Sequence, residues 1–267
     1  MLKTTIKGII LAGGNGRRLD PLTKITNKHL LPVYDRPMVM YPLQTLLDAG
    51  IREILIVTGK NYAGGFIKLL GSGHDFGCKI TYETQDEALG IAHALSLAED
   101  FADKKNIMII LGDNIFEASF KEAVDEFEGQ KGARIFLKET REANRFGVAV
   151  LDDDKVVSIE EKPKKPKTNY AVTGCYFYDN DVFDAIRSLK PSERNELEIT
   201  DVNNYYIKKG LLQAFFIDGN WTDAGTFESL YRANTVARKI AYRRLQVRRI
   251  EDIARKTSSK KPYKALR

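Results

Sequence analysis

The chain has 267 residues, of which 43% are hydrophobic and 29% are charged, and its formal net charge is +6. No apolar run is long enough to cross a bilayer, and an apolar strand follows Met1 within a few residues, so we expect no membrane segment and no signal peptide. Cys78 and Cys175 are too few for a disulfide framework. This composition favours a cytoplasmic globular protein with one large core or two small ones.

The positive charge is concentrated at the C-terminal end of the sequence. Residues 238–267 hold twelve Lys and Arg against two acidic residues, so residues 1–237 carry a net charge of about −4. We therefore expect neither nucleic acid nor membrane as a partner, although such a tail can attract polyanions. Apolar residues such as Ile240 and Leu245 alternate with the charges, which favours packing on the body or on another subunit, with the last ten residues frayed.

The first predicted element is a strand at residues 9–11, which leads into a glycine-rich loop at residues 13–16 followed by Arg17 and Arg18. Backbone N–H groups and arginines on such a loop suit phosphate groups. Leu19 stands where a dinucleotide-binding fingerprint requires glycine, and the two arginines stand where a P-loop requires Gly-Lys. Both of these common phosphate loops are excluded, which leaves another ligand loop or a plain tight turn.

Helical and strand patterns alternate through the first half of the chain. We expect helices at 37–49, 62–70, 88–99 and 119–127, and strands at 53–58, 78–84, 106–111 and 133–138. This alternation predicts an α/β fold with a mostly parallel, Rossmann-like sheet covered by helices on both faces. Ligands bind beyond the carboxyl ends of such strands, where the glycine loop and Asp113 lie.

The second half has a different pattern. We expect a hairpin of strands 146–151 and 155–160, strands at 171–178 and 211–217, helices at 181–189 and 200–209, and a long helix from 226 to about 244. No linker or internal repeat divides the chain. Residues 1–237 are therefore predicted to form one unit with lobes at about 1–138 and 139–225, followed by the basic tail at 238–267.

Seven motifs in order then suggest a family. LAGGNGRRLDPLT at 11–23, followed by KHLLPV at 28–33, resembles the signature of the sugar-1-phosphate nucleotidyltransferases. The resemblance narrows to their glucose-1-phosphate thymidylyltransferase branch through LGDN (111–114), FGV (146–148), EEKP (160–163), NYAVTG (169–174), ELEITD (196–201) and WTDAGT (221–226). It covers nearly all of residues 6–236 and implies the nucleotidyltransferase fold, with the second lobe binding the sugar.

The resemblance implies a transfer of thymidylate from dTTP to glucose 1-phosphate that releases pyrophosphate, as in the first step of dTDP-rhamnose and other dTDP-deoxysugar synthesis. It also implies a homo-oligomer, either a dimer or a tetramer. Such a transfer needs positioning and charge neutralisation more than acid–base groups, because the attacking phosphate oxygen is already ionised. The presence of only three histidines is consistent with this chemistry.

The resemblance also assigns site residues. Mg2+ would be held by Asp113 and Asp223, although residue type and position alone favour an ordinary helix cap or turn residue at each. Catalytic roles fall on Arg18, Lys28, Asp113, Lys162 and Asp223. Nucleotide contacts fall on Leu11, Ala12, Gly13, Gly14, Gly16, Arg18, Lys28, Gln85 and Gly90, and sugar-phosphate contacts on Asn114, Gly147, Glu161, Lys162, Val172 and Arg194.

Two positions, Gln85 and Phe146, leave substrate choice open. The amide of Gln85 matches thymine or uracil but can turn over to match cytosine, so this residue alone cannot choose the base. His93, where glutamine is common in the family, is expected to be an exposed helix residue. Phe146 replaces a tyrosine that is common there, which bears on the identity of the sugar.

Other interpretations remain. A different nucleotide such as UTP, a different hexose 1-phosphate, a non-catalytic sugar-nucleotide-binding regulator and a polyanion-binding protein all fit parts of the sequence. The Asp-x-Asp patterns at 152–154 and 179–181 resemble metal motifs, but we expect a hairpin tip and a helix start. Because the tail does not match that of longer relatives, we expect no allosteric nucleotide site.

Overall fold

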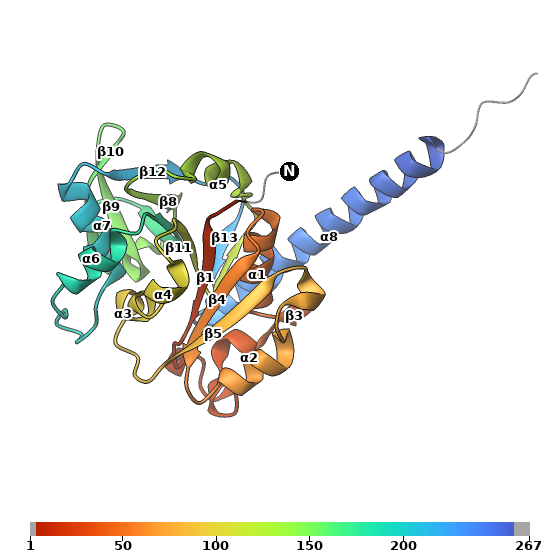
Figure 1. The fold of residues 1–267 in the computed structure, drawn as a ribbon, viewed down its shortest axis with the longest axis horizontal. Coiled ribbons are helices and arrows are strands. Elements are labelled where there is room, and N and C mark those ends of the chain that lie inside the picture. Colours follow the sequence, from red (N-terminus) through yellow and green to blue (C-terminus); the bar gives the residue numbers. More distant parts are fainter. Residues whose placement is uncertain (1–3, 259–267) are drawn as a thin grey trace, which may run out of the picture.

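The structure is a computed structural model that describes residues 4–258, and one mixed sheet runs through the described chain (Figure 1). Its strand order is β10-β9-β11-β6-β1-β4-β5, with β8 beside β11 and β12 beside β8. The strands are β1 (Lys7–Ala12), β4 (Glu53–Gly59), β5 (Lys79–Gln85), β6 (Ile107–Leu111), β8 (Ala133–Glu139), β9 (Gly147–Asp152), β10 (Lys155–Glu161), β11 (Tyr170–Tyr178) and β12 (Leu212–Phe216).

The first half of the sheet is parallel. β1 lies between β4 and β6, and Ile9 is opposite Leu55 on one side and Ile109 on the other. These side chains are almost fully buried, as expected of strands covered on both faces. β11 then runs antiparallel to both β6 and β8. The predicted α/β fold is confirmed, and the parallel order belongs mainly to its first half.

Helices cover the two faces of the sheet (Figure 1). One apolar cluster packs α3 (Ile91–Ser96), α4 (Glu99–Ala102), α6 (Val182–Arg187) and α7 (Ile199–Lys208) on one face. A second cluster packs α1 (Met40–Asp48), α2 (Ala63–Leu70) and α5 (Lys121–Phe127) on the other. Because both faces are buried, the loops at the strand ends are the parts of this half that remain open to ligands.

The helix predicted at 88–99 is wrong in extent. Residues 86–90 form a loop, α3 begins only at Ile91, and α4 follows as a separate turn. Gly90 has a φ of 103°, and a Cβ there would lie 2.4 Å from the carbonyl oxygen of Leu197. The carbonyl oxygen of Leu197 also accepts the N–H of Ala92 at 3.1 Å. This tertiary contact, which the local pattern does not show, starts the helix late.

Two short strand pairs were not predicted. β2 (Pro32–Val33) pairs with β3 (Arg36–Pro37), and β7 (Asn114–Phe116) pairs with β13 (Trp221–Asp223). Strands of two or three residues are too short to show an alternating pattern. The second pair matters for the site because it places Asn114 opposite Asp223, which joins two motifs more than 100 residues apart.

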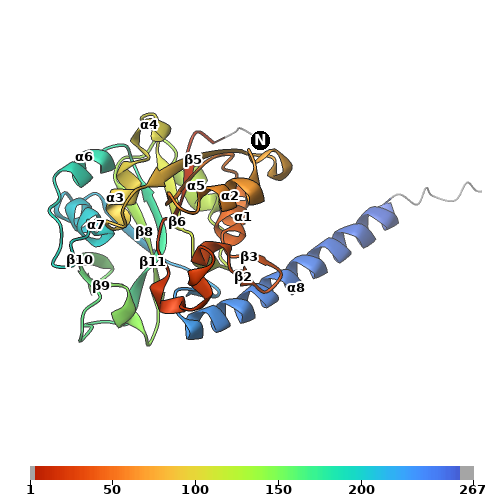
Figure 2. The same cartoon turned by 90° about the horizontal axis from the view of Figure 1, so that it is seen from below.

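The last helix, α8 (Phe227–Ser258), is longer than predicted. Its first turns bury Ala233 and Ala237 against a small apolar cluster, whereas its later turns extend away from the body in both views (Figures 1 and 2). Tyr242 is 53% exposed and Leu245 is 63% exposed. The expected packing of this tail on the body is therefore wrong for its outer part, while packing on another subunit stays a prediction.

Fraying is expected of the last ten residues, and those from 259 onward lie outside the described part of the chain. Among the helices of residues 4–258, none combines the length and apolar character needed to cross a membrane. The predicted lobe boundaries at 138, 225 and 237 stay predictions, although one sheet runs through both lobes.

Candidate active site

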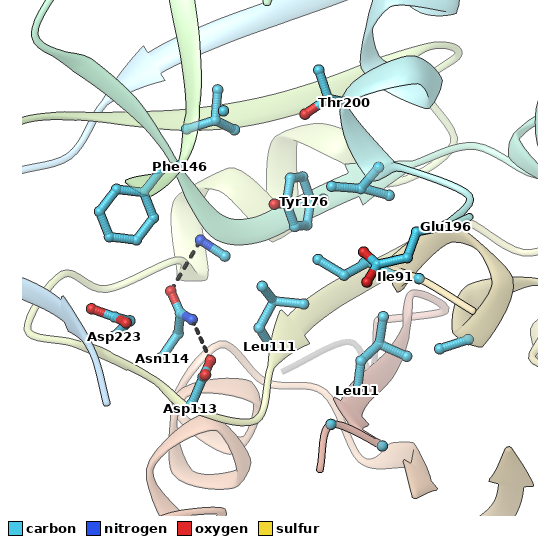
Figure 3. A pocket seen from close by; sticks show the side chains of 18 of the residues that line it. Leu11, Ile91, Leu111, Asp113, Asn114, Phe146, Tyr176, Glu196, Thr200 and Asp223 are labelled. Atoms are coloured by element: carbon cyan, nitrogen blue, oxygen red, sulfur yellow. Dashed lines mark hydrogen bonds between the residues drawn. The ribbon is translucent and has the colours of Figure 1, made fainter. Parts of the chain in front are cut away.

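A cavity of about 290 Å³ opens at the carboxyl ends of β1, β5 and β6, between the two predicted lobes (Figure 3). Most of the residues singled out in the sequence border it. They are Leu11, Gly13, Gly14, Arg18, Lys28, Gln85, Gly90, Asp113, Asn114, Gly147, Glu161, Lys162, Val172 and Asp223. Ala12, Gly16 and Arg194 do not line the cavity but lie in direct contact with residues that do or next to them in the chain.

Lys28 and Asp113 form an ion pair at the end of the cavity next to the glycine loop. Gly16, with a φ of 67°, lets the loop pass close to Lys28, since a Cβ there would lie 2.8 Å from the Lys28 Cβ. Burial by itself raises the pKa of the Asp113 carboxyl, but the charge and hydrogen bond of Lys28, the nearby His29 and the hydrogen bond from Asn114 together outweigh burial and hold this pKa well below its usual range. Asp113 is therefore ionised at neutral pH.

Asn114 fixes the other oxygen of Asp113. Its Nδ2 donates to Asp113 Oδ1 at 2.9 Å, while its Oδ1 accepts from the N–H of Gly174 at 3.0 Å (Figure 3). The same Oδ1 also accepts from Trp221 Nε1 at 2.7 Å. Both ends of this buried amide are thus engaged within the protein. In this arrangement Asn114 orients Asp113, and the sugar contact expected of it stays a prediction.

Asp223 is held by Arg145, a residue that the sequence analysis missed. Arg145 donates to Asp223 Oδ2 at 2.7 Å and to Glu142 Oε2 at 2.6 Å, and Glu142 in turn receives both arms of Arg232 from α8 at 2.8 and 2.9 Å. Burial and the nearby charge of Asp113 raise the pKa of the Asp223 carboxyl, although Arg145 opposes them. The only sequence signal for Arg145 was its place directly before the FGV motif.

The two carboxylates converge on Gly225. A Cβ at Gly225 would lie 3.0 Å from Asp223 Oδ2, 3.5 Å from Asp113 Oδ2 and 2.9 Å from the Arg18 guanidinium. In the described chain no group of three or more His, Cys, Asp or Glu could enclose a metal ion. Two carboxylates with space for phosphate oxygens and water are the kind of site that suits a magnesium ion carried with a nucleotide.

His29 lies beneath this site and is neutral. Burial, with a further contribution from Lys28, lowers its pKa to about 3. Its Nδ1 donates to Asn27 Oδ1 at 2.7 Å. Gly112 is required beside the ring, since a Cβ there would lie 2.7 Å from the imidazole. His29 therefore supports the strand end that carries Asp113 without adding charge.

Cations and carboxylates alternate at the opposite end of the cavity. Glu161 contacts Lys162 at 2.8 Å, accepts from Thr200 Oγ1 at 2.5 Å and lies 3.5 Å from Arg194. Lys162 has a φ of 42° and donates its N–H to the carbonyl of Phe146 at 3.0 Å. This backbone bond keeps the Lys162 side chain next to Glu161 at the cavity wall.

Arg194 is surrounded by acidic groups. Besides Glu161, it lies 2.8 Å from Glu196 and 3.3 Å from Glu198. Burial raises the pKa of the Glu198 carboxyl. The loop that carries Arg194 is thus tied to the cavity by charge pairs, and Glu196, which the sequence analysis did not assign, borders the cavity itself (Figure 3).

Aromatic rings form the wall between the two ends. The Phe146 and Trp221 ring centroids are 4.9 Å apart, and Tyr176 faces the cavity from β11 (Figure 3). Arg145 also stacks over Phe146, with 5.2 Å from its guanidinium carbon to the ring centroid. These contacts of Phe146 involve only its ring, so they do not require the hydroxyl group of a tyrosine.

Gln85 borders the cavity beside the glycine loop and is only 5% exposed. Its Nε2 lies 2.9 Å from His93 Nδ1. His93 is half-buried in the first turn of α3, so the expectation of a merely exposed helix residue is wrong. The sequence analysis missed this contact because the loop at 86–90 separates Gln85 from α3 along the chain, and only the fold brings the two side chains together.

The two Asp-x-Asp patterns have ordinary structural roles. Asp152 ends β9, and Asp153 and Asp154 form the exposed turn before β10. Asp179 accepts from the N–H of Gly132 at 2.7 Å and from the Tyr206 hydroxyl at 2.7 Å, and Asp181 precedes α6. Neither pattern borders the cavity.

Comparison with known proteins gives consistent similarities. Residues 7–239 match the nucleotidyl transferase family model. The chain is 43% identical to a glucose-1-phosphate thymidylyltransferase of Neisseria meningitidis and 46% identical to one of Mycolicibacterium smegmatis, over 93% of this chain and 88% of each relative.

Solved structures show the same likeness. A Bacillus anthracis protein assigned as a glucose-1-phosphate thymidylyltransferase and crystallised with sucrose is 52% identical, with a TM-score of 0.84 over 88% of this chain and 96% of that chain. A UDP-glucose pyrophosphorylase in complex with UDP-glucose is 25% identical, with a TM-score of 0.77 over 88% of this chain and 98% of that chain.

Proposed function

The chain belongs to the nucleotidyl transferase family, and we propose that its cavity transfers the thymidylyl group of dTTP to glucose 1-phosphate, forming dTDP-glucose and pyrophosphate. The observation that carries this proposal is the convergence of Asp113, Asp223 and Arg18 around Gly225. It gathers two carboxylates and a cation where nucleotide phosphates would lie. The product would feed dTDP-deoxysugar synthesis, for example that of dTDP-rhamnose.

In the proposed reaction, a phosphate oxygen of glucose 1-phosphate attacks the α-phosphorus of dTTP. The bond from the α-phosphorus to the bridging oxygen breaks, and pyrophosphate leaves with that electron pair. The chain need only align the two phosphates and neutralise their charges. Arg18 and Lys28 would hold the departing pyrophosphate, and the guanidinium group of Arg18 could bind two of its oxygens at once.

Asp113 and Asp223 would hold Mg2+, which would supply positive charge to offset the negative charge of the phosphates. Before the nucleotide arrives, Lys28 pairs with Asp113 and Arg145 pairs with Asp223. These pairs orient both carboxylates, and each cation opposes the rise in carboxylate pKa that burial causes. Release of Lys28 from Asp113 would then free its ammonium group for the nucleotide phosphates.

The sugar phosphate would lie toward Lys162 and Arg194, with the Glu161 carboxylate accepting hydrogen bonds from sugar hydroxyls. Gly147 has no side chain and so would let the sugar approach the backbone closely. A Cβ at this position would lie 3.1 Å from Thr200 Oγ1. Leu11, Gly13, Gly14, Gln85 and Gly90 would surround the nucleotide, and Asn114 and Val172 would border the sugar.

A second candidate keeps the chemistry and changes the base. The likeness to a UDP-glucose pyrophosphorylase favours UTP as an alternative nucleotide. Uracil and thymine share the same hydrogen-bonding edge and differ by one methyl group. A methyl group contributes only about 1 kcal/mol in an apolar site, so a modest preference separates the two candidates.

The proposal is tested by pyrophosphate release with glucose 1-phosphate and magnesium, in parallel reactions with dTTP, UTP, CTP, ATP and GTP. We expect the fastest release with dTTP. Faster release with UTP would support the second candidate, and release only with another hexose 1-phosphate would change the sugar. Binding of dTDP-glucose without any release would instead support the non-catalytic regulator.

We also propose that the chain assembles as a homo-oligomer, a dimer or a tetramer, through the exposed outer part of α8. Tyr242 and Leu245 are the described apolar side chains that such a contact would cover. Sedimentation of the full chain and of Leu245→Glu measures this assembly. A monomeric full chain would contradict it.

A further inference from the structure

We propose that Glu142 keeps Arg145 on a single oxygen of Asp223, so that the other oxygen of this carboxylate is left for the metal ion. Arg232 of α8 holds Glu142 in place for this task. Glu142 and Arg232 are then positioning residues for the metal site. The inference rests on the proposed function, because it assumes that Asp223 helps to hold the magnesium ion of the nucleotide.

The four side chains form a line of alternating charge that runs from the surface to the cavity. The side chains of Arg232 and Glu142 are 44% and 43% exposed. Those of Arg145 and Asp223 are 21% and 10% exposed, and both residues border the cavity, with Asp223 visible in Figure 3. An effect of Arg232 on the cavity can therefore pass through Glu142 and Arg145.

Arg145 divides its guanidinium group between two carboxylates. Its Nη1 donates to Glu142 Oε2 at 2.6 Å, and its Nη2 donates to Asp223 Oδ2 at 2.7 Å. The N–H of Gly225 donates to the same Asp223 oxygen at 3.2 Å. In the part of the chain that the structure describes, Asp223 Oδ1 receives no hydrogen bond, so this oxygen is left for a ligand.

Without Glu142, the same arginine has a competing arrangement. A guanidinium group can bind both oxygens of one carboxylate through two parallel N–H groups, which is stronger than a single hydrogen bond. Elsewhere in the chain Arg36 binds Asp35 in this way, with both contacts at 2.8 Å. Arg145 could do the same with Asp223 once its Nη1 had lost Glu142. Both oxygens of Asp223 would then be engaged, and binding of the metal would require this pair to open.

A second cation fixes the plane of the Glu142 carboxylate. Arg232 Nη1 donates to Glu142 Oε1 at 2.9 Å, and Arg232 Nη2 donates to Glu142 Oε2 at 2.8 Å. Burial raises the pKa of the Glu142 carboxyl, but the hydrogen bonds from Arg145 and Arg232 outweigh burial and lower this pKa below its usual value. Glu142 is therefore ionised at neutral pH and can hold an arm of each arginine.

The first turns of α8 fix the place of Arg232. The helix starts shortly after Asp223 in the chain. The N–H of Thr226 donates to Ser229 Oγ at 3.0 Å, and the N–H of Ser229 donates to Thr226 Oγ1 at 3.2 Å. Ala233, next to Arg232, is fully buried. The start of the helix is thus anchored by a cap and by burial, so Arg232 meets its carboxylate from a fixed backbone.

The test measures how much magnesium strengthens the binding of dTTP. Dissociation constants are determined by calorimetry with magnesium and with EDTA, without sugar phosphate, and their ratio is the magnesium enhancement. Wild type is compared with Glu142→Gln and Arg232→Gln. Glu99→Gln and Arg187→Gln are the matched controls, because Arg187 also joins two carboxylates, those of Glu99 and Asp184, but does not border the cavity.

We expect Glu142→Gln to lower the magnesium enhancement roughly tenfold, because metal binding then breaks one charge-assisted hydrogen bond of Arg145. Arg232→Gln should lower it about threefold, since Glu142 then keeps only one cation. Glu99→Gln and Arg187→Gln should keep the wild-type enhancement. A merely structural role would weaken dTTP binding with and without magnesium alike, and would leave the ratio unchanged.

An Arg145→Lys background separates geometry from charge. A lysine ammonium group is a point charge and does not bind two carboxylate oxygens in the parallel arrangement of a guanidinium group. Adding Glu142→Gln to this background removes the same negative charge as before, but it should change the magnesium enhancement by less than about twofold. An equal drop in both backgrounds would show that the charge of Glu142 acts by itself, and would overturn the inference.

An unchanged enhancement in Glu142→Gln or in Arg232→Gln would also overturn it, as would a wild-type protein that binds dTTP equally well with and without magnesium. Thermal unfolding shows whether each variant is folded. Arg232→Gln, which changes a half-exposed side chain, keeps the test decisive if Glu142→Gln is unfolded. Failure of the wild type to bind dTTP at all would instead overturn the proposed function, which distinguishes the two outcomes.

Discussion

The end of the cavity proposed to bind the nucleotide and the end proposed to bind the sugar phosphate, called below the nucleotide end and the sugar end, hold their charges in different ways. At the nucleotide end, the side chains of Asp113 and Asp223 are 12% and 10% exposed, and each is paired with a cation from the chain. At the sugar end, Lys162 and Arg194 are 43% and 45% exposed and share several carboxylates. The nucleotide end is therefore built before any ligand arrives, whereas the sugar end can readjust around its ligand.

This difference predicts the kind of damage that a substitution causes. Buried charges at the nucleotide end act on both stability and turnover, because a lost partner leaves a charge with little access to water. Exposed charges at the sugar end act mainly on the binding of one substrate. The following variants test this contrast.

The largest effect is expected for Asp113→Asn. The change keeps the shape of the side chain but removes a carboxylate proposed to hold Mg2+, so kcat should fall roughly 100- to 1,000-fold. Pyrophosphate release measures turnover, and circular dichroism checks the fold. Asp154→Asn, on the exposed hairpin turn, is the control and should keep full activity. Unchanged turnover of Asp113→Asn would remove Asp113 from the metal site.

Arg145→Ala should mainly affect stability. It leaves the Asp223 carboxylate buried without its cation and separates it from Glu142, which should lower the free energy of unfolding by about 3 kcal/mol. Urea unfolding in the absence of magnesium measures this. Lys121→Ala, which removes an exposed pair with Asp125, should cost less than about 0.5 kcal/mol. Similar losses for both would contradict the contrast between buried and exposed charges.

Arg194→Ala tests the sugar end. We expect KM for glucose 1-phosphate to rise roughly 10- to 100-fold while the affinity for dTTP is largely preserved, since a charge-assisted phosphate contact is lost. Initial rates at varied concentrations of each substrate measure the two effects separately. An equal loss for both substrates would show that Arg194 acts on the whole cavity.

The smallest effect is expected at His29, through pH. An unfolded His29 binds a proton below about pH 6.5, whereas the buried side chain, with its pKa near 3, stays neutral. Its contribution to stability is therefore complete at pH 7 and falls as the pH drops toward 3, by about 1 kcal/mol at pH 5.5.

His29→Gln should be less stable than wild type at pH 7 but should lose less stability on acidification. Urea unfolding at pH 7 and pH 5.5 gives both values. The same loss with pH in both proteins would show that another group titrates in this range.

Much of the fold was predictable because its elements follow local patterns. The apolar strand at residues 9–11 and the strand at 106–111 were recognisable from sequence, since strands buried on both faces are continuously apolar. The late start of α3 was not, because it depends on the contact between Gly90 and Leu197. The β7 and β13 pair was also missed, since three residues show no periodicity.

The residues of the candidate site also divide into those that could be recognised from sequence and those that could not. Asp113, Asp223 and Lys28 were found because their motifs could be recognised. Arg145 and His93 were missed because an arginine in a polar loop and a histidine on a helix have no distinguishing neighbours in sequence. Their roles depend on side-chain contacts with Asp223 and Gln85 that form only when separate elements pack together.

The sequence by itself determined the order of the longer strands and helices and the position of the glycine-rich loop, because hydrophobic periodicity and glycine positions act over a few residues. It also supplied the chemistry of the charged groups. Only the tertiary structure decided which cation pairs with which carboxylate, that the side chains of Gln85 and His93 meet, and where α8 leaves the body. Those features depend on distances and burial across the sheet. The energy of a charged group depends on whether water or protein surrounds it, and sequence neighbours have less influence on that energy.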